Sequence, residues 1–138
     1  MSTEANIHAQ ERFGVAVNTG RLDELDEVVA FDCVDHDPAP GQGRGPQGFK
    51  VLFTGLRASF PDLNFSVEHL TAAGDDVAFA YTITGTHKGP LMGYAPTDRS
   101  FRIRGMQLGR FEDGKLVERW GSSDQLGMLT QLGLVPRP

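Results

Sequence analysis

Residues 100–122 have the sequence SFRIRGMQLGRFEDGKLVERWGS, and this stretch decides the fold. We expect residues 100–111 and 115–122 to form two long β-strands. The EDG segment at residues 112–114 predicts a three-residue turn that joins the two strands into an antiparallel hairpin. A β-sheet is therefore expected in the second half of the chain.

Two further strands are expected before this hairpin, because alternation also marks residues 63–67 and 77–83, with the GDD segment at 74–76 as their turn. Apolar residues recur at helical spacing elsewhere. The helices predicted from this spacing cover residues 3–18, 22–29, 45–60 and 125–132. In the first helix the apolar stripe consists of Ala9, Phe13, Ala16 and Val17.

Helices followed by antiparallel strands indicate an α+β fold. We expect N-terminal helices packed on a strongly curved antiparallel sheet, which forms a cone-shaped α+β barrel with a central pocket. One domain, residues 1–138, accounts for the whole sequence. The Gly- and Pro-rich stretches 35–44 and 88–99 are expected to be irregular and to border the pocket.

The composition is that of an ordinary soluble domain, with 39% hydrophobic and 22% charged residues. A formal net charge of −5 argues against a nucleic-acid partner. No stretch approaches the roughly 18 apolar residues that span a bilayer, so we expect no membrane association and a cytoplasmic location. The single cysteine, Cys33, is expected to be a buried, inert thiol.

The turn at residues 112–114 predicts the register of the last hairpin, with Gln107 opposite Arg119 and Gly105 opposite Gly121. These four residues would share one face of the sheet. If that face lines the pocket, the amide and guanidinium bind substrate oxygens and the two glycines deepen the space. In the alternative interpretation the glycines only permit curvature and Arg119 is exposed.

Asp124 and His36 are the candidate catalytic groups, as general acids or bases. Asp124 has the simpler alternative role of a helix N-cap, and His36, beside Asp37 and Pro38, that of stabilising a turn. Met92 and Tyr94 are expected either to close over the pocket and contact substrate or to contact another subunit. The four histidines are too dispersed for a metal-ligand motif, so no metal is predicted.

A series of short motifs extends along nearly the whole chain in a fixed order. They are His36-Asp37-Pro38, Gly45-Pro46, Phe60-Pro61-Asp62, residues 85–89 (GTHKG), 96–99 (PTDR), 110–115 (RFEDGK), 118–120 (ERW) and 131–133 (QLG). Together these motifs resemble those of the SnoaL-like polyketide cyclases, a family similar in fold to nuclear transport factor 2. The resemblance implies an α+β cone, a homodimer, an apolar cavity, and aldol ring closure without a cofactor.

The resemblance also implies an acid/base carboxylate directly after the Trp of the ERW motif, and this sequence has Gly121 there. Two other positions where the family often carries His hold Arg119 and Gln107. The sequence therefore suggests a cofactor-independent enzyme that acts on a bulky apolar carbonyl compound by ring closure, isomerisation or hydration, without the usual carboxylate. The alternative is a non-catalytic protein that binds a small apolar molecule in the same pocket.

Overall fold

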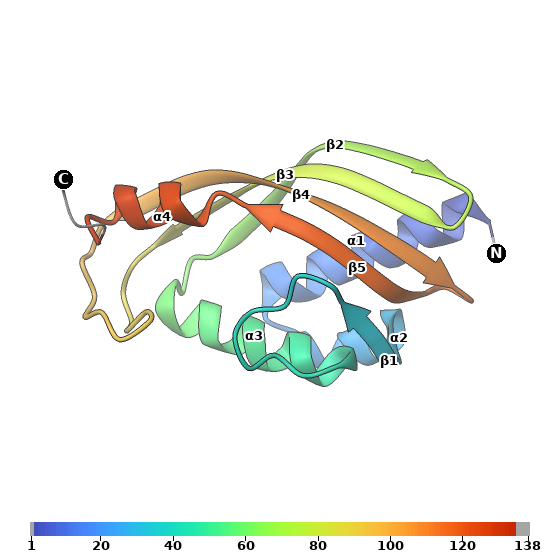
Figure 1. Cartoon of the computed structure of the whole chain (residues 1–138), viewed down its shortest axis with the longest axis horizontal. Coiled ribbons are helices and arrows are strands. Elements are labelled where there is room, and N and C mark those ends of the chain that lie inside the picture. The colour runs from blue at the N-terminus through green and yellow to red at the C-terminus, as the bar shows by residue number, and fades with distance from the viewer. Residues whose placement is uncertain (1, 135–138) are drawn as a thin grey trace.

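A computed structural model describes residues 2–134. The chain folds in the order α1 (Thr3–Thr19), a 3-10 turn (Leu22–Glu24), α2 (Leu25–Val28), β1 (Val29–Asp35), α3 (Gly45–Ser59), β2 (Asn64–Ala73), β3 (Asp76–Thr86), β4 (Ser100–Glu112), β5 (Lys115–Ser123) and α4 (Gln125–Gln131). Long strands form a curled sheet, and α1 and α3 lie along one side of it (Figure 1). The α+β class is as predicted.

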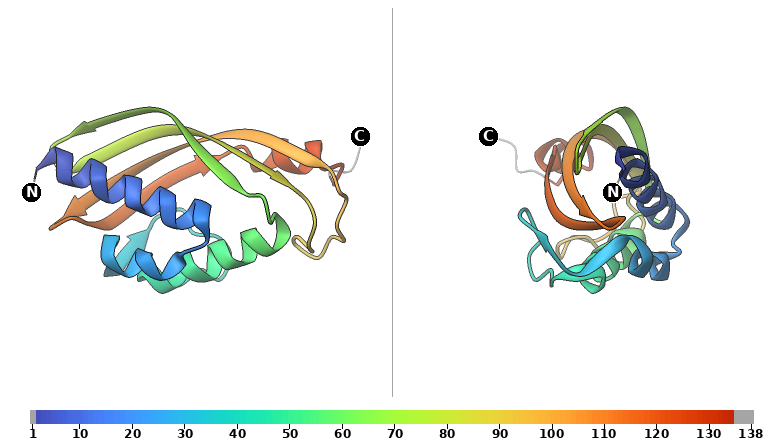
Figure 2. Two further views of the ribbon diagram at one scale, coloured as in Figure 1. Left: turned by 180° about the vertical axis from the view of Figure 1, so that it is seen from behind. Right: turned by 90° about the vertical axis from the view of Figure 1, so that its right-hand side faces the viewer.

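The sheet has the strand order β1-β5-β4-β3-β2. The four predicted strands, β2 to β5, pair antiparallel as expected. The sheet is nevertheless mixed, because β1 adds a parallel pair with β5. The edge strands β1 and β2 are not paired with each other in the described residues, so the curl is not closed. Viewed end-on, the sheet arches over the helices (Figure 2). We call the side of the sheet that faces the helices its inner face and the other side its outer face.

Strand β1 was not predicted from the sequence. Residues 22–29 were assigned to one helix, whereas the structure has a 3-10 turn, a single turn of α-helix and then a strand that begins at Val29. The strand carries Asp32 and Asp35, which obscure its alternation, and it is defined by pairing with β5, where Val29 lies opposite Leu116. Such pairing is tertiary information that local propensity does not contain.

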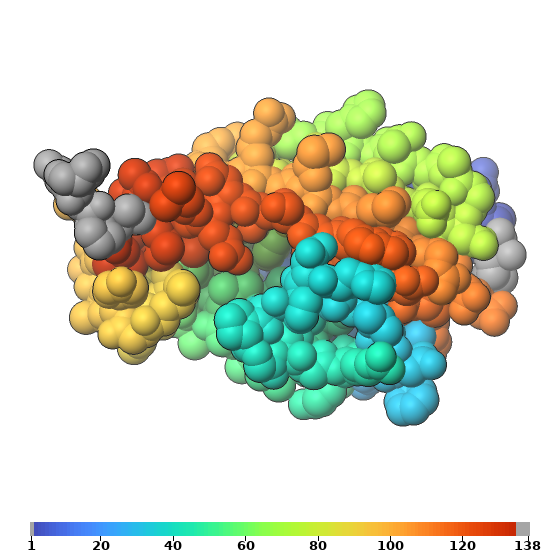
Figure 3. Space-filling view, viewed as in Figure 1, coloured from blue at the N-terminus to red at the C-terminus, as the bar shows by residue number. Residues whose placement is uncertain are grey.

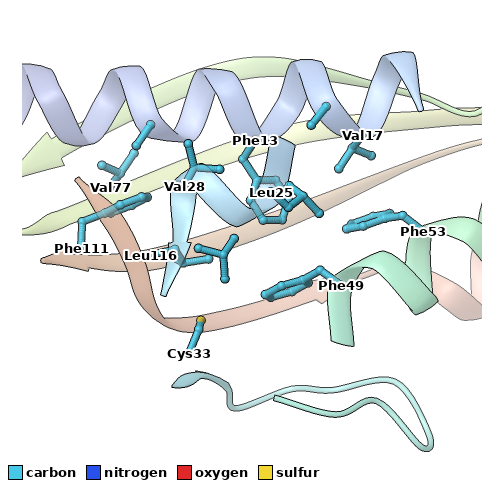
Figure 4. Packing of buried hydrophobic residues seen from close by; sticks show 13 residues of the cluster. Phe13, Val17, Leu25, Val28, Cys33, Phe49, Phe53, Val77, Phe111 and Leu116 are labelled. Atoms are coloured by element: carbon cyan, nitrogen blue, oxygen red, sulfur yellow. The ribbon is translucent and has the colours of Figure 1, made fainter. Parts of the chain in front are cut away.

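The main core lies between α1, α3 and the inner face of the sheet (Figure 4). The predicted stripe of α1 is buried throughout, with Ala9, Phe13, Ala16 and Val17 at most 7% exposed. The Phe13 and Phe49 rings meet edge to face at 5.4 Å, and Val77, Phe111 and Leu116 supply the strand side of the core. Burying each large apolar side chain contributes roughly 1.5–3 kcal/mol, so these contacts hold the helices under the sheet.

A second cluster closes the other end of the molecule. It consists of Phe60, Leu63, Leu91, Phe101, Ile103 and Leu132. Gly45 starts α3 at φ +70°, and a Cβ there would collide with the backbone carbonyl of Phe31. Because only glycine allows this approach, α3 begins directly against β1 and fixes both ends of the loop 36–44. None of the helices between residues 2 and 134 combines the length and apolar character needed to cross a membrane.

Candidate active site

The β4–β5 hairpin determines which side chains meet on the inner face. Glu112 pairs with Lys115 across a two-residue turn in which Asp113 and Gly114 have φ of 51° and 75°. A register irregularity follows next to Arg110, and beyond it Gln107 lies opposite Gly121. The predicted register was therefore wrong by two residues, because the turn is tighter than three residues and a bulge follows it.

An error of two residues leaves the side-chain face unchanged, because the side-chain period of a strand is two. Gly105, Gln107, Arg119 and Gly121 thus share the inner face. On the neighbouring strand, Tyr81 lies opposite Gly105, and it is 5% exposed.

The two glycines make room for protein side chains. A Cβ at Gly105 would collide with the Tyr81 ring, and a Cβ at Gly121 would lie 2.5 Å from Nη2 of Arg119. Tyr81 and Arg119 therefore occupy the space beside these glycines. The expectation that both glycines deepen a pocket for substrate stays a prediction. Burial raises the pKa of the Tyr81 phenol, and the nearby Arg119 charge opposes this only in part. Tyr81 is therefore a neutral phenol at physiological pH.

Arg119 links the strand end of β1 to the centre of the sheet. Its Nη1 donates to both carboxylate oxygens of Asp35, at 3.0 and 3.2 Å, and its Nε donates to Oε1 of Gln107 at 2.8 Å. The side chains of Arg119 and Asp35 are only 17% and 5% exposed. We call Asp35, Arg119 and Gln107 the inner cluster. The alternative in which Arg119 is a surface residue does not hold.

The Asp35 carboxylate has no unused oxygen. Besides the two bonds from Arg119, Oδ2 accepts from Nε2 of Gln42 at 3.0 Å and Oδ1 accepts from the backbone N–H of Asp37 at 2.9 Å. Such a carboxylate is suited to holding its partners in place.

The Gln107 amide has a fixed orientation, because only its oxygen can accept from Arg119. Its Nε2 is buried and has no hydrogen-bond partner within residues 2–134. A buried donor without an acceptor costs about 1–3 kcal/mol. The inner cluster thus holds one buried N–H donor whose hydrogen bond is unmade among the described residues.

A cleft of about 520 Å³ opens at the edge of β5, where β1 has ended. It is lined by Asp37, Pro38, Arg119, Gly121 and residues 122–126. Figure 3 shows this hollow between the loop after β1 and α4. Its lining is mainly polar, and through Arg119 it reaches the inner cluster.

The model of the SnoaL-like polyketide cyclase family matches residues 7–132. The chain belongs to this family. The resemblance recognised in the sequence motifs is thereby confirmed.

Individual relatives and solved structures are similar to this chain in sequence and in fold. The nogalonic acid methyl ester cyclase of Streptomyces nogalater is 34% identical over 122 residues, which covers 86% of this chain and 90% of the relative. TsrD of Streptomyces laurentii superposes with a TM-score of 0.89 at 25% identity, over 98% of this chain and 99% of that one. IdmH of Streptomyces antibioticus gives a TM-score of 0.83 at 33% identity, over 93% and 98%.

Within this SnoaL-like fold, the two predicted catalytic residues lie in different places. Asp124 borders the cleft, and its Oδ1 accepts from the backbone N–H of Gly127 at 2.9 Å, which makes it the N-cap of α4. His36 pairs with Glu118 at 2.8 Å and stacks on Trp120 at a centroid distance of 4.6 Å. Glu118 and Trp120 belong to the outer face, so the structure does not bring His36 to the inner cluster.

Met92 and Tyr94 lie in a turn stabilised by hydrogen bonds between Leu91 and Tyr94. Leu91 is buried in the second cluster, whereas Met92 and Tyr94 are 71% and 44% exposed and do not line the cleft. The proposed contact of these two residues with substrate stays a prediction.

Three residues of the site were missed or undervalued in the sequence. Asp35 and Gln42 were assigned to an irregular loop because β1 was not recognised, and Asp37 was considered only as a neighbour of His36. The signal that points to Asp37 is structural, since its Oδ2 accepts from the backbone N–H of Gly121 at 2.9 Å.

Cys33 is 2% exposed, and burial, together with the nearby Asp35 and Asp32, raises the pKa of its thiol to about 12. It is the inert thiol that was predicted. In the part of the chain described by the structure, no three His, Cys, Asp or Glu side chains are grouped so that they could hold a metal ion.

Proposed function

We propose that this SnoaL-like protein is a cofactor-independent enzyme that rearranges a bulky carbonyl compound, by ring closure or isomerisation, in the cleft beside β5. The orphaned Nε2 of Gln107 carries the proposal, because a buried donor on the inner face is suited to a carbonyl oxygen that becomes an enolate. Arg119 adds positive charge next to that oxygen and fixes the amide that binds it.

The cluster stabilises the negative charge that develops on the substrate oxygen. A donor that is already oriented and desolvated costs no reorganisation when the charge forms, so it lowers the transition state more than the ground state. Asp35 contributes by holding Arg119 from the opposite side. We also propose that Gly121 replaces the carboxylate that the family usually carries there, so that the proton-transferring group comes from elsewhere in the cleft.

The substrate class is suggested by the relative from Streptomyces nogalater, whose name describes a cyclase for nogalonic acid methyl ester. We therefore propose a polyketide-type ester or a close analogue. The first experiment is to incubate the purified protein with nogalonic acid methyl ester and follow cyclisation by chromatography and absorbance.

A Gln107→Glu variant tests the role of the amide. The carboxylate still accepts from Nε of Arg119 but has no N–H to offer a substrate oxygen. We expect kcat to fall by about 100-fold or more, as when one oxyanion-hole donor is removed. Gln47→Glu is the matched control. Gln47 is exposed on α3, so this substitution introduces the same charge away from the cleft.

Each result has a distinct meaning. Equal activity in Gln107→Glu and in the control would remove Gln107 from the mechanism. Tight binding of the ester without turnover by the unmodified protein would favour the alternative, a non-catalytic binding protein that uses the same cleft.

We further propose the homodimer that the sequence analysis expected. Apolar side chains on the outer face support it, since Leu108 and Trp120 lie opposite each other at 37% and 36% exposed and Met106 is 68% exposed. Sedimentation of a Met106→Asp variant tests this, because the variant should sediment as a monomer. The same mass in the variant and in the unmodified protein would mean that any self-association uses another surface.

A further inference from the structure

Three carboxylates lie near Arg119 and the cleft, and they differ in what their oxygens already bind. Both oxygens of Asp35 are fully used, and its side chain is 5% exposed. Asp124 caps α4 through Oδ1. Asp37 uses Oδ2 for the backbone N–H of Gly121, and its Oδ1 has no hydrogen-bond partner among residues 2–134.

We propose that Asp37 is the general acid/base of this cleft, a proposal that rests on the function proposed above. Asp37 is exposed and lines the cleft together with Arg119 and Gly121, so a bound substrate can reach its free oxygen.

Register favours Asp37 over Asp124. Gly121, to which the Asp37 carboxylate is bonded, lies directly opposite Gln107. Asp124 comes three residues later, which is about 10 Å along an extended strand, and its backbone N–H is bonded to Arg104. A general base has to be within hydrogen-bond reach of the proton that it removes while the donor holds the same molecule. Of Asp37 and Asp124, Asp37 is the one that lies beside Gly121, the residue paired with Gln107.

The Asp37 side chain is also held in position. Its backbone N–H donates to Oδ1 of Asp35, the same carboxylate that binds Arg119, and Pro38 restricts the backbone immediately afterwards. One buried carboxylate thus positions both the guanidinium and the turn that carries the base. This matters because a small displacement of a catalytic group costs a large part of its effect.

The proposed step is balanced without a co-reactant. The Asp37 carboxylate takes a proton from the carbon next to a carbonyl, and the electrons of that C–H bond form an enolate whose oxygen accepts from Nε2 of Gln107. The enolate carbon then forms a C–C bond to a second carbonyl carbon of the same molecule. The oxygen of that carbonyl receives the proton from the carboxylic acid of Asp37, so no electrons are gained or lost overall.

The test is Asp37→Asn, measured in two ways with the same ester. Asn keeps an oxygen for the Gly121 N–H but cannot carry the proton. We expect kcat for cyclisation to fall by about 100-fold or more with KM within about threefold, as for loss of a general base. Exchange of the substrate's α-hydrogen for deuterium in D₂O, followed by NMR, should fall in parallel.

Asp32→Asn is the matched control, because Asp32 is an exposed carboxylate on β1 for which the structure shows no side-chain hydrogen bond within residues 2–134. It should keep both activities. Asp37→Glu, which moves the carboxylate by one methylene, should retain part of the exchange activity if the carboxylate is the working group. Thermal unfolding of each variant separates loss of chemistry from loss of fold.

The outcomes distinguish this inference from the proposed function. Normal turnover in Asp37→Asn, together with loss of turnover in Gln107→Glu, would overturn only the proposed role of Asp37 and would leave the proposed function standing. Loss of activity in Asp124→Asn with normal Asp37→Asn would assign the role to Asp124. If the unmodified protein showed neither cyclisation nor exchange, both proposals would be overturned.

Discussion

Strand β5 carries an arginine–carboxylate pair on each of its faces, and the two pairs differ in burial. On the inner face, Arg119 bonds Asp35 at 3.0 Å, with side chains 17% and 5% exposed. On the outer face, Glu118 bonds Arg110 at 2.7 Å, with side chains 27% and 36% exposed. The shorter contact is thus the more exposed one.

Distance alone therefore does not rank these pairs. Water and salt screen the outer pair, and such pairs contribute little to stability. The inner pair is desolvated, so removal of one partner leaves the other charge buried and uncompensated. Strand β5 thus contributes to two different kinds of ion pair. The Arg119–Asp35 pair holds the site residues in position, and the Glu118–Arg110 pair lies on the surface.

Breaking the inner pair should give the largest effect. Asp35→Asn leaves Arg119 buried without a countercharge, and we expect the free energy of unfolding to fall by about 3 kcal/mol or more, as for other broken buried pairs. Urea denaturation measures it. Adding Arg119→Met should recover part of the loss, because the uncompensated charge is then gone. A loss below about 1 kcal/mol in Asp35→Asn would mean that the pair is solvated in solution.

The packing of the inner face should respond next. Gly105→Ala pushes a methyl group into the Tyr81 ring, and we expect a loss of about 1–3 kcal/mol, typical of overpacking. Gly14→Ala is the matched control, since a Cβ there meets nothing within 4 Å and lies in α1. It should increase stability by up to about 1 kcal/mol through helix propensity. The two substitutions should therefore have opposite signs, and the same sign in both would show that the Tyr81 ring moves away freely.

Breaking the outer pair should have a much smaller effect. Glu118→Gln removes the charge that faces Arg110 and His36, and we expect a loss well below that of Asp35→Asn, decreasing further in 1 M NaCl. Denaturation at low and high salt gives the comparison. Equal losses from the inner and outer substitutions would contradict the ranking by burial.

The smallest expected effect is the pH dependence of the outer pair. Hydrogen bonds from His36 and then Arg110 lower the pKa of the Glu118 carboxyl. A lowered pKa stabilises the fold above the ordinary value of about 4.3, and this contribution is lost as pH falls through the lowered folded-state pKa. The stability difference between the unmodified protein and Glu118→Gln should therefore shrink between about pH 5 and about pH 3. A difference that grows on acidification would contradict this sign.

Much of the framework could be predicted because it follows local periodicity. The apolar stripe from Ala9 to Val17 and the alternation along β3 predict which residues are buried, and the even register error left Gln107 and Arg119 on one face. The candidate site was harder to predict. Asp35 belongs to a strand that exists only through its pairing with β5, and the close approach of Asp37 to Gly121 depends on that same pairing.

The sequence by itself determined the class of fold, the family and the common face of Gln107 and Arg119, because these depend on short-range spacing and on motifs in a fixed order. Only the tertiary structure decided the exact strand register and which side chains lie beside Gly105 and Gly121. It also decided that His36 contacts the outer face of the sheet, whereas Asp35 binds Arg119 on the inner face. The physical reason is that these features arise where distant segments pack and compete for the same volume and the same hydrogen bonds.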